Sequence, residues 1–328
     1  MIETILNNGV DMILGLQNLG DWIFAPMKFF TFLGTEDFYL LVMPILLWCV
    51  DARLGLRVGI ILLASGSVNT LLKWTFHLPR PYWYDARVTG MTAESSFGVP
   101  SGHSQLPASI YGLIAATIKR SWAWTAAIIL IALIGFSRMV LGVHFHIAVL
   151  IGWTAGFLVL WAFLRLEAPL TAWLDKQSMP KKLGSVFIVS LLIILSGSLL
   201  LASLNGFELE PQWVQNALAD QPEDTLDPLT LNNIITHAGA LFGLAAGAFW
   251  LAQRGGFSAK GQAAHLVLRV IIGLAGVLVL WQGLGAVFPR DPNLLGFTLR
   301  YIRYALIGLW MAGLAPALFI RFGLAQKS

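Results

Sequence analysis

Residues 149–164 read VLIGWTAGFLVLWAFL, a run without a single charged side chain. Only His144 and His146 interrupt the uncharged stretch that extends from Arg138 to Arg165. A helix needs roughly 20 apolar residues to cross a hydrocarbon core of about 30 Å. This segment therefore predicts a membrane-spanning helix, and it suggests that the rest of the chain should be searched for others.

The whole composition agrees with a membrane protein. The 328 residues are 57% hydrophobic and 12% charged, with a mean hydropathy of +0.74, far from the balance of soluble proteins. We expect an all-α, polytopic transmembrane helical bundle with about nine spans. The candidate spans are 36–50, 54–72, 104–118, 122–142, 146–165, 183–204, 231–252, 264–288 and 301–320. Asp11, Asp21 and Lys28 interrupt residues 5–34, which favours an N-terminal interfacial amphipathic helix there, although a tenth span stays open.

If successive spans cross the membrane in opposite directions, the charged residues of the connecting loops separate between its two sides. One side receives most Lys and Arg residues, and the other receives the acidic stretch at 206–228. The positive-inside rule makes the basic side cytoplasmic. The formal charge of +4 thus reflects topology, and we expect no nucleic-acid partner. We expect an integral protein of a bacterial plasma (inner) membrane; the sequence identifies no protein partner.

The loop LEAPLTAWLDKQSMPKK, residues 166–182, combines proline with mixed charge and is the clearest boundary. We divide the chain there into a membrane domain at 1–165, a cytoplasmic linker at 166–182 and a four-span membrane region at 183–328. The last region is rich in Gly and Ala, which predicts close helix packing. The sequence gives it no other role.

Polar residues gather at span ends on the side away from the cytoplasm. They are Lys73, Arg80, His103, Arg138 and His144. Charges within membrane segments are costly and tend to mark function. Three cations imply an anion, and two guanidinium forks with one ammonium suit an anion with several oxygens. We therefore expect this side to bind phosphate.

The stretch VPSGHSQ, residues 99–105, adds to this expected site. Its turn leads into a helix, so Ser101, Gly102 and the positive helix end can meet the same anion. Of two histidines beside phosphate, a neutral one can attack phosphorus while a protonated one protonates the leaving oxygen. The cations would stabilise the equatorial oxygens. The residues outline a phosphomonoesterase without metal or cofactor.

Three motifs resemble a known family. KWTFHLPRP at 73–81, PSGH at 100–103 and SRMVLGVH at 137–144 resemble the signatures K-x6-R-P, P-S-G-H and S-R-x5-H-x3-D of the type 2 phosphatidic acid phosphatase superfamily. The resemblance covers roughly residues 30–165. It implies metal-independent removal of phosphate from a lipid phosphate or polyprenyl diphosphate, through a phosphohistidine.

The resemblance also implies a role for each matching residue. His144 would be the nucleophile and His103 the general acid. The phosphate would be bound by Lys73, Arg80, Ser101, Gly102 and Arg138. The partners implied are a membrane lipid phosphate and the phosphate ion.

The third motif departs from the family pattern at its end, where Ala148 stands in place of Asp. Positions i and i+4 of a helix share a face, so Asp at this position could hold one tautomer of His144, as in a hydrolytic triad. Alanine cannot. Three explanations stay open: a natural member with another orienting group, an engineered inactive form, or a natural pseudoenzyme. Asp85 and Glu94 are carboxylates on the same side, but neither has a spacing that points to His144.

Two hypotheses for function follow. The first is lipid phosphate dephosphorylation at the extracytoplasmic face, with activity impaired by Ala148. The alternative is a catalytically silent protein that binds or transports a phospholipid or polyprenyl phosphate, in which the distal spans carry the role. His146 would face away from His144 on a helix and is expected to be a polar group at the helix end. We expect no metal site on this histidine pair, because the carboxylate ligand that would accompany it is absent. His77, His237 and His265 are expected in loop or packing roles.

Overall fold

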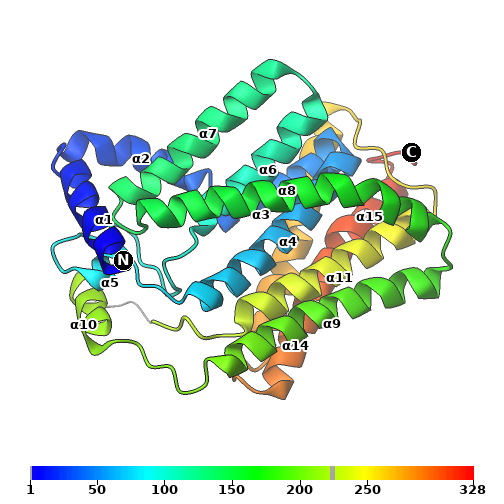
Figure 1. Ribbon diagram of the computed structural model, residues 1–328. Coiled ribbons are helices and arrows are strands. Elements are labelled where there is room, and N and C mark those ends of the chain that lie inside the picture. Colours follow the sequence, from blue (N-terminus) through cyan, green and yellow to red (C-terminus); the bar gives the residue numbers. More distant parts are fainter. Residues whose placement is uncertain (1, 222–225) are drawn as a thin grey trace. The chain divides into compact units, whose positions relative to one another are not determined.

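The computed structural model describes residues 2–221 and 226–328. These residues form helices and connecting loops with no β-strand, which confirms the all-α prediction (Figure 1). The α-helices are α1 (Ile2–Gln17), α2 (Phe24–Phe32), α3 (Glu36–Ile45), α4 (Ala52–Phe76), α5 (Pro81–Tyr84), α6 (Gly102–Ile118), α7 (Ser121–Val140), α8 (His146–Asp175), α9 (Met179–Ser203), α10 (Pro211–Asp220), α11 (Asn232–Ala252), α12 (Ala263–Leu278), α13 (Leu284–Val287), α14 (Leu294–Leu309) and α15 (Ala315–Arg321). A 3₁₀ turn forms at Asp21–Ile23, and π-helical turns form at Leu46–Val50, Val279–Gly283 and Trp310–Leu314.

Seven helical segments in the described residues are long and apolar enough to cross a membrane. They are Ala52–Tyr84, Ser121–Val140, His146–Asp175, Met179–Ser203, Asn232–Ala252, Ala263–Val287 and Leu294–Arg321. An eighth arises if Asp21–Phe32 and Glu36–Val50, which meet at 48°, form one broken span. The predicted number of about nine is therefore too high. When the broken span is counted, the only predicted span that is missing from the described residues is 104–118, because α6 has 17 residues, at the lower limit of the length that crosses a membrane.

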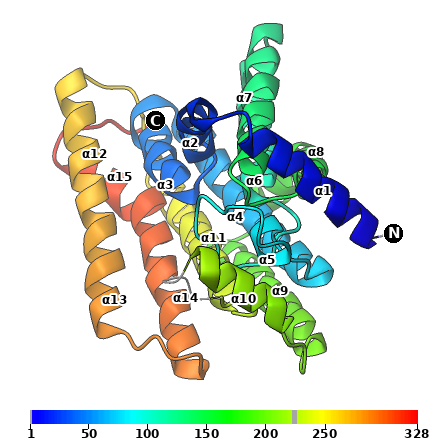
Figure 2. The same ribbon diagram turned by 90° about the vertical axis from the view of Figure 1, so that its left-hand side faces the viewer.

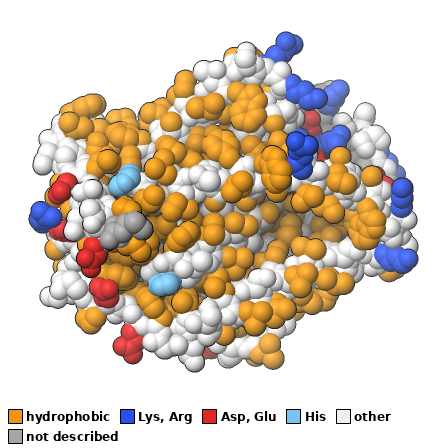
Figure 3. All heavy atoms as spheres, viewed as in Figure 1, with side chains coloured by type: hydrophobic (Ala, Val, Ile, Leu, Met, Phe, Trp, Pro, Cys, Tyr) orange, Lys and Arg blue, Asp and Glu red, His pale blue; other side chains and the backbone are white. Residues whose placement is uncertain are grey.

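Hydrophobic side chains cover most of the molecular face shown in Figure 3. Many large ones are solvent-exposed in the structure, among them Trp161 at 61% and Leu199 at 63%. Soluble proteins rarely expose contiguous apolar surface of this extent. A lipid environment accounts for it, because the bilayer core is as apolar as these side chains.

The chain forms two compact units whose residue ranges alternate along the sequence. Unit 1 comprises Met1–Phe38, Val68–Trp161 and Ser198–Thr230, and unit 2 comprises Tyr39–Ser67, Ala162–Gly197 and Leu231–Ser328. Most of the segment expected as a linker, 166–182, is helical, because it holds the end of α8 and the start of α9. The functional division that we placed there stays a prediction.

Unit 1 packs through small residues and a partly apolar N-terminal helix. Ala108 and Ala115 of α6 meet Ala123, Ala127 and Ile131 of α7 in one buried cluster, and small side chains let two helices approach closely. Helix α1 buries one face, formed by Leu6, Val10 and Ile13. Its spacing is that of an amphipathic helix, as predicted. The helix does not extend over residues 5–34, however, because it ends at Gln17 and Phe24–Phe32 forms a separate helix.

The acidic stretch at 206–228 takes part in unit 1 through α10. Asn216 donates to the Trp83 carbonyl at 2.9 Å, and the Gly90 N–H donates to an Asp220 carboxylate oxygen at 2.8 Å. These bonds hold α10 against α5 and the loop that follows it. The described part of the stretch is therefore packed against α5 and the loop that follows it, and is not simply a solvated loop.

The helices of unit 2 pack closely against one another, and α12 lies beside α15 in Figure 2. Gly239 and Gly243 of α11 lie against the backbone of Tyr301 and Ala305 in α14, as the Gly- and Ala-rich composition predicts. The buried Arg269 of α12 donates to the carbonyls of Trp48, Ala259, Lys260 and Leu324. This arginine therefore joins four chain segments and has a structural role.

Candidate active site

The ends of five helices bring the predicted site residues together in unit 1. Lys73 lies in the last turn of α4, and Arg138 in the last turn of α7. Arg80 precedes α5, His103 is in the first turn of α6, and His144 lies in the turn before α8. Arg80, Arg138 and His144 are buried. Residues far apart in the sequence thus form one cationic cluster.

A segment between the first two motifs completes this cluster. We call residues 94–98, ESSFG, the ESSFG segment. Ser96 accepts a hydrogen bond from Lys73 Nζ at 2.6 Å through its hydroxyl and from Arg80 Nε at 2.7 Å through its carbonyl. Sequence reasoning did not single out Ser96, because a serine in an irregular loop carries no spacing signal. It nonetheless orients two of the three cations.

Glu94 of the ESSFG segment bridges both arginines. Arg80 Nη2 lies 3.1 Å from Glu94 Oε2, and Arg138 Nη2 pairs with the other carboxylate oxygen. Arg138 Nη1 also donates to Thr31 Oγ1 at 2.6 Å. Buried guanidinium groups need such partners, since an unpaired buried charge is strongly destabilising. The protein's own carboxylate therefore occupies the space between the two guanidinium groups that suits an anion.

The charges around Glu94 decide its ionisation. Burial raises the pKa of the Glu94 carboxyl, but Arg80 and Arg138, helped by His103 and Lys73, hold the pKa well below its usual range. Glu94 is thus ionised at neutral pH. Because its folded pKa is depressed, this stabilisation is present above the unfolded pKa of about 4.3 and is lost as the pH falls through the folded value.

The hydrogen bonds of His144 fix its tautomer. Nδ1 lies 2.7 Å from the Gly98 carbonyl oxygen, and Nε2 lies 3.2 Å from Arg80 Nη1. A carbonyl can only accept and a guanidinium can only donate, so Nδ1 carries the proton and Nε2 presents its lone pair. Burial, with the charges of Arg80 and Arg138, holds the pKa of His144 well below its usual range. The imidazole is therefore neutral, with its lone pair facing a guanidinium group.

Gly98 supplies the acceptor that the sequence lacks at position 148. Ala148 is fully buried in the first turn of α8, and its carbonyl accepts the Ser101 N–H at 3.0 Å. Asp85 pairs instead with Arg87 at 2.7 Å. A backbone carbonyl is a common partner for the Nδ1–H of a functional histidine. No residue type marks such a contact, so the sequence could not have revealed it.

The start of α6 provides further polar groups. Ser101 is its N-cap residue, and its buried hydroxyl has no hydrogen-bond partner among the described residues. Its N–H is occupied by Ala148, so the expectation of free amides from this turn does not hold at Ser101. A side chain at Gly102 would put its Cβ 3.3 Å from Asn69 Oδ1, so this turn packs closely. His103 makes no hydrogen bond with a described residue.

A metal site at this cluster is not favoured by its residues. Across the described chain, no group of three or more His, Cys, Asp or Glu side chains is arranged to hold a metal ion. His146 lies beside Gly9 rather than beside His144: a Cβ at Gly9 would be 3.4 Å from His146 Nδ1. The charged groups that surround the cluster are instead those that bind an oxyanion.

Comparison with known proteins agrees with this arrangement. Residues 54–172 match the family model of the PAP2 superfamily, and residues 235–327 match the model described as PAP2 superfamily phosphatase, transmembrane extension. The chain contains a PAP2 superfamily phosphatase domain with its transmembrane extension. The distal region, whose role could not be predicted from its composition, thus contains a match to the transmembrane extension of PAP2 superfamily phosphatases.

Individual relatives differ in how much of this PAP2 chain they match. Glucose-6-phosphatase 3 from Bos taurus is 25% identical over 363 aligned residues, covering 100% of this chain and 98% of the relative. Phosphatidylglycerophosphatase B from Bacillus subtilis is 28% identical over 151 residues, covering 42% and 72%. A crystal structure of a transmembrane PAP2 type phosphatidylglycerolphosphate phosphatase from Bacillus subtilis has 24% identity and a TM-score of 0.41, covering 48% of this chain and 86% of that one.

Proposed function

We propose that this PAP2 protein removes the terminal phosphate from a lipid phosphate or polyprenyl diphosphate at the extracytoplasmic membrane face, without a metal. One observation carries the proposal: the lone pair of His144 Nε2 faces Arg80, and Arg80 and Arg138 already hold a carboxylate between them. A phosphoryl group that replaces this carboxylate would lie next to the nucleophile, His144, and next to the two arginines that stabilise its negative charge. The distribution of Lys and Arg supports the extracytoplasmic face.

The proposed reaction has two steps. His144 Nε2 attacks phosphorus and the bond to the leaving oxygen breaks. Burial and Arg138 hold the pKa of His103 well below its usual range, so His103 takes up a proton together with the anionic substrate and transfers that proton to the leaving oxygen. Water then gives a proton to His103 and attacks the phosphohistidine, which breaks the P–N bond and releases inorganic phosphate. Lys73, Arg80 and Arg138 balance the charge on the equatorial oxygens in both steps.

The hydrogen bond to Gly98 supports a natural enzyme that uses another orienting group. As the first step proceeds, His144 becomes positively charged, and the Nδ1–H bond to a carbonyl stabilises this charge less than a carboxylate would. Impairment by Ala148 stays a prediction, but the tautomer that the reaction needs is already fixed.

A soluble sugar phosphate is the second candidate substrate. The alignment with glucose-6-phosphatase 3 runs the full length of this chain, including the distal helices, whereas phosphatidylglycerophosphatase B aligns with 42% of it. The location of the cluster at the ends of membrane helices favours a headgroup whose tails stay in the bilayer. Both substrates would present a phosphomonoester to the same residues.

The experiment that separates these candidates is phosphate release by the purified chain in mixed micelles. Phosphatidate, phosphatidylglycerol phosphate, undecaprenyl diphosphate and glucose 6-phosphate should be compared with and without a chelator. We expect a lipid substrate to have the highest kcat/KM and the chelator to have no effect. Preference for glucose 6-phosphate would establish the second candidate. Tight lipid binding without turnover would establish the silent binding protein instead.

Ala148→Asp tests the role of the Gly98 carbonyl. Since Nδ1 of His144 already has its acceptor and Ala148 is fully buried, we expect the new carboxylate to compete with phosphate for the arginines. The expected result is unchanged or lower kcat/KM, measured with the best substrate of the panel. Ala148→Ser, which adds an oxygen without charge, is the matched control. A rise of about 100-fold or more in Ala148→Asp would show that the site lacks its orienting acid.

Glu94→Gln tests whether Glu94 competes with phosphate. The glutamine keeps the shape but removes the charge that Arg80 and Arg138 now share. We expect inorganic phosphate to inhibit this variant at a concentration about tenfold lower, because charge-assisted hydrogen bonds of roughly 1.5–3 kcal/mol no longer have to be replaced. Thermal stability without phosphate should fall. An unchanged inhibition constant would mean that Glu94 and phosphate do not compete.

A further inference from the structure

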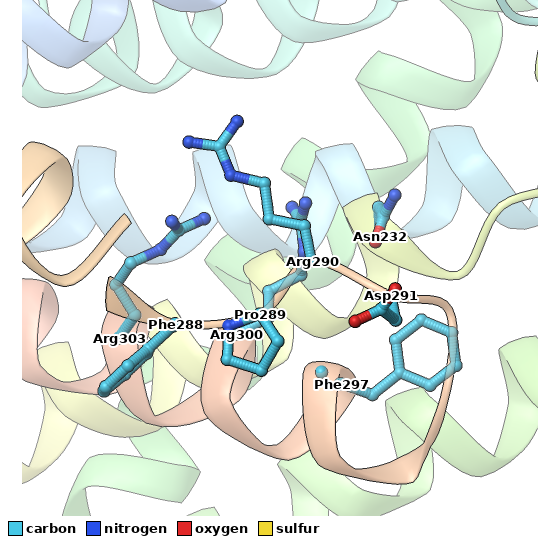
Figure 4. A pocket seen from close by; sticks show the side chains of 9 residues that line it. Asn232, Phe288, Pro289, Arg290, Asp291, Phe297, Arg300 and Arg303 are labelled. Atoms are coloured by element: carbon cyan, nitrogen blue, oxygen red, sulfur yellow. The ribbon is translucent and has the colours of Figure 1, made fainter. Parts of the chain in front are cut away.

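A second cluster of arginines lies in unit 2, apart from the three motifs in the sequence. Arg290, Arg300 and Arg303 line a small, partly open cavity between the end of α13 and the first turns of α14. In Figure 4 the guanidinium groups of Arg290 and Arg303 extend to the same side of α14. Asp291 also lines the cavity. Three positive charges thus face a space with one negative charge.

These arginines are incompletely satisfied within the described chain. Arg300 donates to Thr236 Oγ1 at 3.2 Å and Arg290 donates to the Gly285 carbonyl at 3.1 Å. Arg303 is 93% buried, since its exposed fraction is 7%, yet its Nε has no hydrogen-bond partner. Among residues 2–221 and 226–328, none of the three forms an ion pair. A buried cation without such partners is costly, and its N–H groups can donate hydrogen bonds to an anion.

Arg269 of the same unit shows what a purely structural arginine looks like. Its guanidinium group makes five hydrogen bonds to backbone carbonyls. A guanidinium group has five N–H donors, so Arg269 has none to offer a ligand. Arg303 instead lies over the Tyr304 ring at 4.9 Å and keeps its donors. The cavity arginines are therefore not explained by packing alone.

We propose that this cavity binds a tetrahedral phosphate-type anion, either free phosphate or the headgroup of an anionic lipid. The three guanidinium groups can donate hydrogen bonds to several oxygens of one phosphate. The cavity also begins where an apolar segment ends, and the nearby side chains of Val287, Leu294 and Leu295 are highly exposed. Acyl chains of a lipid could cover these side chains while its phosphate lies at the open mouth of the cavity, within reach of the arginines.

The first test is titration of the purified full chain with inorganic phosphate, followed by ³¹P NMR or calorimetry. We expect two phosphate-binding sites. The double variant Arg300→Gln, Arg303→Gln should lose the site at the cavity, and Arg138→Gln should lose the site at the motif residues. The affinity of the affected site should fall at least about tenfold, since each arginine removed takes away a charge-assisted hydrogen bond. Arg254→Gln, an exposed arginine of the same unit, is the matched control. Arg300→Gln alone, at a half-buried position, guards against a folding defect of the double variant.

The second test separates the two sources of the phosphate. Native mass spectrometry of the chain from micelles with phosphatidylglycerol, or with phosphatidylcholine only, shows whether an anionic lipid is retained. Retention of phosphatidylglycerol that is lost in the double variant identifies a lipid headgroup. Binding of inorganic phosphate without lipid retention identifies free phosphate. If the double variant, folded by size exclusion and thermal unfolding, binds both ligands as the unchanged chain does, the proposal is overturned.

Discussion

Replacing His144 with alanine is expected to lower kcat for phosphate release by about 10⁴-fold or more, the scale seen when a nucleophile is removed from a hydrolase. The structure holds Nδ1 of this residue with the Gly98 carbonyl and directs the Nε2 lone pair at Arg80 Nη1. No other neutral imidazole in the described cluster has both contacts. Single-turnover release from the preferred substrate of the panel measures the loss.

His146→Ala is the matched control for this variant. It removes the same ring two positions later, where Nδ1 has no hydrogen-bond partner among the described residues, so activity should stay within a few-fold. A phosphorylated intermediate trapped by acid quench should be seen in the unchanged chain and in His146→Ala but not in His144→Ala. Substantial turnover by His144→Ala would instead assign the nucleophile to another residue.

The membrane character of the fold was predictable because it depends on composition over long segments. The run at 149–164 lies in α8, and each of the seven spanning segments overlaps a predicted one. The number of spans was less predictable. Helix α6 begins at the Gly102 turn and ends at Lys119, which adopts a left-handed conformation with φ 56°. Hydropathy alone does not mark such limits, because helix length depends on where the chain must turn.

The active-site prediction was strongest where the side chain itself forms the contact. Arg80, Arg138 and His144 could be grouped because charged and imidazole side chains in membrane segments are rare and tend to mark function. The ESSFG segment could not be predicted as part of the cluster. It acts through the Glu94 carboxylate, which has no motif spacing, and through the carbonyls of Ser96 and Gly98, which every residue type possesses. Ala148 drew attention to a missing acceptor, but only the structure shows where the chain provides one.

Gly98→Ala is expected to lower kcat by about 100-fold with a smaller change in KM, because a displacement of about 1 Å at a catalytic group can have this effect. The Gly98 N–H donates to the Leu78 carbonyl at 2.9 Å, so this residue is held against the first motif. An added Cβ would lie 2.9 Å from the Pro79 carbonyl carbon and 3.1 Å from Arg80 Cα. The backbone must move apart, and the acceptor of His144 Nδ1 moves with it.

Ser95→Ala, at an exposed position of the same segment, is the matched control and should keep full activity. A purely structural role for Gly98 would lower stability without changing His144, so the tautomer must be measured directly. ¹⁵N NMR of His144 should show protonated Nδ1 in the unchanged chain and a mixture of tautomers in Gly98→Ala. If Gly98→Ala remains folded, keeps the single tautomer and still loses activity, the carbonyl is not the orienting group. The low activity would then have to come from displacement of Arg80, whose Cα meets the added methyl group.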